Sequence, residues 1–79
     1  MNKDQQELKK FLEQELVSSR EQSRILEEIS ETLHKMKTIA EFASQPDLSE
    51  SERENLHDEL VDLKSVIHSL EKKLQSVFH

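Results

Sequence analysis

Four histidines and several groups of carboxylates are the side chains of this sequence that could hold a metal ion. The histidines are His34, His57, His68 and His79. On one helix His57 and His68 would share a face about 16 Å apart, which is too far for both to ligate one metal. Glu54 and His57 have the Glu-x-x-His spacing of di-iron bundles, but it occurs once and off the apolar face. We therefore expect exposed histidines, no metal site and no cofactor.

The carboxylates could in principle do acid–base chemistry. They form three groups, at 27–31, 50–54 and 58–62. Acid–base catalysis requires carboxylates in a desolvated cleft with separated pKa values. These groups fall on the polar side of the expected helices, so we interpret them as a solvated surface. The sequence has no Cys for thiol catalysis and no Gly for a phosphate-binding loop. We expect no catalytic residues and no enzyme.

Composition narrows the class of protein further. The 79 residues carry 11 Lys+Arg against 17 Asp+Glu, a formal charge of −6, which argues against nucleic-acid and membrane binding. The acids concentrate at 47–62, a segment with seven acids and one base. The sequence contains no apolar run long enough to predict a membrane span. Its polar N-terminus lacks the apolar segment of a signal peptide. We therefore expect a cytoplasmic protein.

The elements that position these residues are two helices separated by a turn. Pro46 disfavours helix at Gln45 and predicts a break there. Ser49 and Glu52 have the spacing of a capping box, which predicts a helix start just after the turn. Apolar residues then recur at steps of four and three, as in a helix that packs along another helix. These are Leu56, Leu60, Leu63, Ile67, Leu70, Leu74 and Val77.

The first helix carries a similar stripe. It consists of Leu26, Ile29, Leu33, Met36, Ala40 and Ala43. Before it lies a polar run, Ser18–Arg24, in which Ser19 and Gln22 also fit a capping-box pattern. Since no Gly or Pro marks a break, we expect one continuous helix. The alternative is a first helix broken near 18–23, which would make a three-helix bundle.

The predicted fold is an all-α antiparallel two-helix hairpin in one domain, 1–79. Helix one spans about 4–43, the turn 44–50 and helix two about 51–77. Two helices alone bury little apolar surface, so we expect a homodimer, most simply a four-helix bundle. Its hairpin or dimer core consists of the stripe residues Leu26, Ile29, Leu33 and Met36 with the seven of helix two.

Three apolar residues near the N-terminus, Leu8, Phe11 and Leu12, find no partner in their own chain. We expect them to bind a partner, together with Phe42, which lies off both stripes. The sequence thus predicts a non-enzymatic protein–protein interaction module, a small regulator or adaptor. One alternative is a structural coiled-coil subunit that self-assembles, and another is a small phosphatase-like or metal-dependent enzyme.

Overall fold

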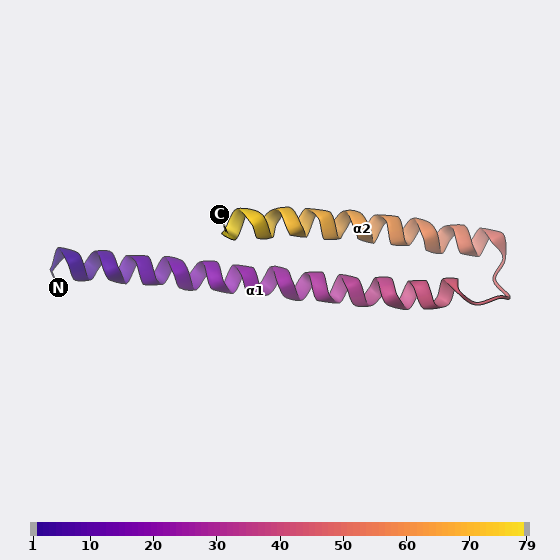
Figure 1. The fold of residues 1–79 in the computed structure, drawn as a ribbon, viewed down its shortest axis with the longest axis horizontal. Coiled ribbons are helices and arrows are strands. Elements are labelled where there is room, and N and C mark those ends of the chain that lie inside the picture. Colours follow the sequence, from indigo (N-terminus) through magenta and orange to yellow (C-terminus); the bar gives the residue numbers. More distant parts are fainter. Residues whose placement is uncertain (1, 79) are drawn as a thin grey trace.

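The computed structural model describes residues 2–78, which form a long antiparallel helical hairpin (Figure 1). Helix α1 spans Lys3–Ala43 and helix α2 spans Glu50–Phe78. The molecule measures 71 × 15 × 11 Å. The all-α hairpin is confirmed. Because α1 runs without interruption through Ser18–Arg24, the alternative of a broken first helix is wrong.

Helix α1 begins at a capping box that the sequence reading missed. The Gln5 N–H donates to Asn2 Oδ1 at 2.9 Å, and the Asn2 N–H donates to Gln5 Oε1 at 3.3 Å. These bonds satisfy two backbone groups that a helix start leaves without partners. The N-terminal turns of α1 are therefore fixed locally, without help from α2.

The turn from Ser44 to Ser49 is held at both ends by the helices. The Ser44 N–H donates to the carbonyls of the last turn of α1, and Pro46 follows where the helix has ended. At the start of α2, the Glu52 N–H donates to Ser49 Oγ at 3.1 Å. The Ser49 hydroxyl donates to Glu52 Oε1 at 3.0 Å. Ser49 is therefore the N-cap, and α2 starts one residue earlier than expected.

The two helices meet along a hairpin seam of half-buried and buried side chains. From α2 the seam takes all seven residues of the predicted stripe, none of which is exposed. From α1 it takes Ile25, Ile29, Thr32, Met36, Ile39 and Ala43.

The side of α1 that faces α2 differs from the predicted hairpin core. Leu26 and Leu33 are 49% and 52% exposed, and Ala40 is exposed as well. Ile25, Thr32 and Ile39, one residue earlier in each case, face α2 instead. These two sets of residues lie side by side along α1. The set that begins with Ile25 is the one that packs against α2. Leu26 and Leu33 are therefore not part of the single-chain core.

The hairpin core is shallow. Among the described residues the buried ones are Ile25, Thr32 and Leu70, at 2%, 8% and 5% exposure. The accessible surface is 6635 Å², whereas a compact monomer of this mass exposes about 5,000 Å². One hairpin thus leaves open surface that a compact domain would cover.

Candidate interaction surface

The first third of α1 extends past the end of α2 (Figure 1). We call residues 3–17 the overhang. Each of its side chains is exposed, and Ser18 is the first half-buried residue of α1. At about 1.5 Å per residue the overhang is a rod of roughly 22 Å. The unequal lengths of the helices therefore present a helix surface that nothing in the described chain covers.

Most apolar residues of the overhang gather on one side, apart from Val17, which is 64% exposed on another side. Leu8, Leu12 and Leu16 follow one another at four-residue intervals and are 57%, 56% and 51% exposed. Phe11, at 55% exposure, lies beside them. The structure thus places the predicted Leu8, Phe11 and Leu12 together on the overhang. It adds Leu16, which the sequence reading left out although its spacing of four from Leu12 was the available signal.

This apolar side continues beyond the overhang. At 100° per residue, Leu8, Leu12, Leu26 and Leu33 all fall within a sector of roughly 60°. We call these four leucines the outer row. It lies about a quarter turn around α1 from the hairpin seam. Because Ile25 and Thr32 face α2 in their place, Leu26 and Leu33 join the overhang leucines on a second apolar face of α1.

Helix α2 has no matching second face. Its exposed apolar residues outside the seam are Val61, Val66 and Phe78, at 49%, 44% and 58% exposure. The columns on either side of its seam carry mostly charged residues and histidine, such as Glu59, Lys64 and Glu71. The apolar surplus of the hairpin therefore belongs to α1.

Phe42 lies at the opposite end of the molecule from the overhang. It is 54% exposed and lines a shallow hollow with Leu48 and Leu56, over the start of α2. Along α1 it is about 50 Å from Leu8. The structure therefore separates Phe42 from the other three predicted partner-binding residues and associates it with the turn.

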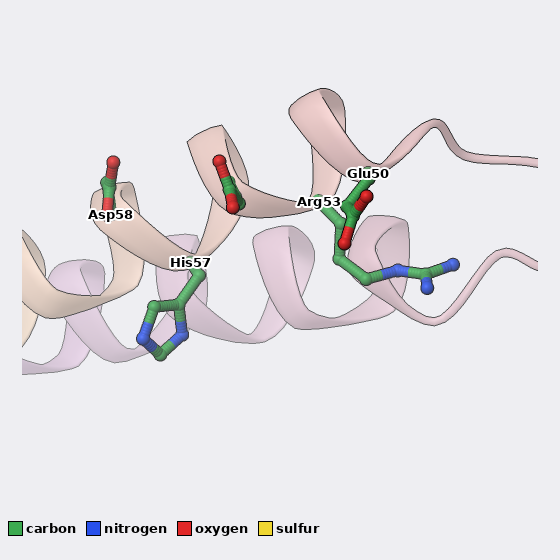
Figure 2. Close-up of a pocket in the computed structure, with 5 residues that line it drawn as sticks. Glu50, Arg53, His57 and Asp58 are labelled. Atoms are coloured by element: carbon green, nitrogen blue, oxygen red, sulfur yellow. The ribbon is translucent and has the colours of Figure 1, made fainter.

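Among the described residues, which exclude His79, the side chains with possible chemistry do not converge on a site. Glu50, Arg53, Glu54, His57 and Asp58 line an open depression at the start of α2. Figure 2 shows His57 and Asp58 pointing to opposite sides of the helix, and Arg53 extending toward the turn. There Arg53 Nη2 lies 3.4 Å from the Gln45 carbonyl oxygen. Within residues 2–78 no three His, Asp or Glu side chains are grouped to hold a metal ion.

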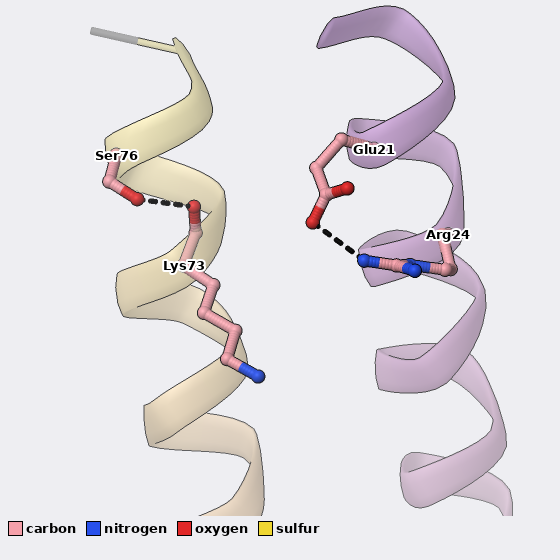
Figure 3. A network of polar contacts seen from close by, with 4 residues as sticks. All are labelled: Glu21, Arg24, Lys73 and Ser76. Atoms are coloured by element: carbon pink, nitrogen blue, oxygen red, sulfur yellow. Dashed lines mark hydrogen bonds and ion pairs between the residues drawn. The ribbon is translucent and has the colours of Figure 1, made fainter. Parts of the chain in front are cut away.

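Polar side chains mark the point where α2 ends and the overhang starts. Arg24 Nη2 donates to Glu21 Oε1 at 2.8 Å, and Ser76 Oγ donates to the Lys73 carbonyl at 2.9 Å (Figure 3). Figure 3 also shows the Lys73 side chain reaching from α2 toward α1. On the α1 side the apolar seam thus gives way to half-buried polar residues, Ser18, Glu21 and Gln22, before the overhang begins.

Comparison with known proteins identifies no relative. No family model matches the chain, and no curated protein or solved structure is significantly similar to it. Neither helix, over the residues described, is apolar enough along its length to cross a bilayer. The class of this protein is therefore defined by its architecture alone, as a helical hairpin with one helix longer than the other.

Proposed function

We propose that this protein is a non-enzymatic interaction module that binds a partner helix on the apolar side of α1. The observation that carries the proposal is the overhang, a capped helix whose Leu8, Phe11, Leu12 and Leu16 are all more than half exposed. An exposed apolar helix side of this kind is a common surface for recognising another amphipathic helix. The cysteine-free composition is compatible with a reducing compartment, so we propose action in the cytoplasm as a regulator or adaptor.

Energetics favour a binding role over an accidental exposure. Complete burial of a fully exposed leucine contributes about 1.5–3 kcal/mol, so each of these half-exposed leucines has roughly half of that to gain, and the set together is a substantial driving force for association. Isolated apolar side chains are ordinary on a protein surface, whereas contiguous ones mark an interaction site. The Lys9–Glu13 pair beside the row, with Nζ and Oε1 4.0 Å apart, keeps its rim polar.

The test is the double substitution Leu8→Glu/Leu12→Glu. Its matched control is Gln6→Glu/Gln14→Glu, which adds the same charge to the overhang on its other sides. Both pairs lie outside the hairpin seam, so circular dichroism at low protein concentration should show two folded helices in each variant. Sedimentation and quantitative co-purification from the source cells should show association lost only in the leucine variant. Equal association of the two variants with every partner, including the protein itself, would refute the proposal.

Self-assembly is the second candidate function. Its specific support is the outer row, because Leu26 and Leu33 extend the apolar side of α1 well past the overhang. A partner that covered the overhang alone would leave them exposed.

A further inference from the structure

We propose that the helix bound on the outer row is α1 of a second copy of this chain, packed antiparallel about a two-fold axis near Ser19. The overhang of each copy then lies along residues 21–35 of the other. At that level the overhang of one copy packs with α1 and α2 of the other copy, so that three helices lie side by side. This inference rests on the proposed function and names the partner of the same surface.

The first argument is area. The hairpin exposes about 1,600 Å² more than a compact monomer of its mass would expose. If each copy buries that excess, the interface totals about 3,200 Å², within the 2,000–5,000 Å² typical of obligate homodimers. One further copy therefore has enough open surface to offer for an interface of obligate-dimer size.

The second argument is the arrangement of the outer row, which is nearly symmetric about Ser19. In an antiparallel pair centred there, Leu12 falls opposite Leu26, and Leu8 falls opposite Leu33 to within one helical turn. The two-fold axis repeats both pairings, so all eight outer-row leucines of the dimer find apolar partners. The polar middle, which on this side comprises Glu15, Ser19, Gln22 and Ser23, meets the same segment of the second copy, and the small Ser19 side chain lies at the axis.

The third argument is charge. The same register places Asp4 within one helical turn of the position opposite Lys37, and Lys9 within two residues of the position opposite Glu31, so opposite charges lie near each end of the outer row. Each pairing occurs twice in the dimer. Pairs of this kind contribute little affinity at a surface, but they select one orientation over another.

The alternatives leave the outer row uncovered or require an apolar face that α2 lacks. If two overhangs paired only with each other through Leu8, Leu12 and Leu16, Leu26 and Leu33 would stay exposed. A four-helix bundle with both α2 helices in its core would need a second apolar face on α2, where the sequence has charged residues. The three-helix arrangement also brings Phe11 to the side where α2 lies, above a seam whose Ile29 and Ile67 are only half-buried.

The experiment uses engineered cysteines in the full chain, which has no cysteine of its own. After mild oxidation, Ser19→Cys should form a disulfide-linked dimer, because its two sulfurs approach at the axis. Mixed Leu12→Cys and Leu26→Cys chains should cross-link to each other. Leu12→Cys alone should not, since its two copies lie about 21 Å apart, beyond the 7 Å reach of a disulfide. Lys10→Cys, on the opposite side of α1, is the matched control and should stay uncross-linked.

Solution mass is measured beside the cross-linking, on the unsubstituted protein. Twice the 9.3 kDa chain mass across a hundredfold dilution series is the expected result. A monomer throughout, or faster cross-linking of Leu12→Cys alone than of Ser19→Cys, would overturn the antiparallel dimer. In that event the co-purification arm decides the broader proposal. Loss of another protein in Leu8→Glu/Leu12→Glu supports the interaction module without the dimer, and no loss removes both.

Discussion

Replacing Thr32 by Val should stabilise the hairpin, although it removes a hydrogen bond. Thr32 is 8% exposed in the seam, and its Oγ1 donates to the Glu28 carbonyl at 2.8 Å. That carbonyl also accepts the backbone N–H of the next helical turn, so the substitution leaves no buried group without a partner. Such a side-chain bond to the preceding turn does not strengthen a helix. A buried methyl group in place of the hydroxyl contributes about 0.5–1 kcal/mol.

Thr38 offers a matched control for this substitution. Its Oγ1 donates in the same way to the His34 carbonyl at 3.1 Å, but the residue is exposed. Since Thr→Val changes helix propensity equally at both positions, the difference between the variants isolates burial. Thr38→Val should change stability by less than about 0.5 kcal/mol.

Urea or thermal unfolding followed by circular dichroism measures both variants. In a domain of this size 1 kcal/mol raises Tm by about 4–8 °C, so the expected difference is readily resolved. Because Thr32 lies in the seam within one chain, the difference between the variants should not depend on protein concentration. If Thr32→Val were less stable than Thr38→Val by 1 kcal/mol or more, the reasoning that its hydroxyl contributes no net stability would be wrong.

Three further substitutions test other parts of the hairpin. Leu70→Ala removes a side chain that is 5% exposed. It should lower the unfolding free energy by about 2–4 kcal/mol in a urea titration. Val66→Ala, on the exposed side of α2, is the control and should lower it much less. Ser49→Ala removes the N-cap of α2 and should cost about 1 kcal/mol, with Ser51→Ala as a neutral comparison by the same assay. Phe42→Ala should lower Tm without changing association by sedimentation, and lost association would place Phe42 in an interface.

Much of the fold could be predicted from the sequence because its signals are local. Pro46 and the Ser49–Glu52 spacing determine the turn and the start of α2 without reference to anything distant. Helix α2 has a single apolar stripe, so the side that faces α1 could be predicted. Continuity of α1 followed from the absence of Gly and Pro in Ser18–Arg24.

The facing side of α1 could not be predicted in the same way. Ile25, Thr32 and Ile39 form one column and Leu26, Leu33 and Ala40 form its neighbour, and both are mostly apolar. On sequence alone leucine is a more usual core residue than threonine, so the predicted stripe took Leu33. Which column turns inward depends on how the turn directs α2, a long-range property that no local pattern records. The same ambiguity concealed the outer row, whose members became visible as one surface only after the seam was known.

The turn between the helices also has a kinetic consequence. All contacts of the seam are made across a connection of six residues, from Ser44 to Ser49. Closing so short a loop costs little chain entropy, and each further layer forms next to one already made. Folding of one chain should therefore be fast and unimolecular, propagating from the turn. The overhang is farthest from the turn and makes no contact within the hairpin. Pairing of two copies would therefore appear as a separate, slower phase whose rate rises with protein concentration.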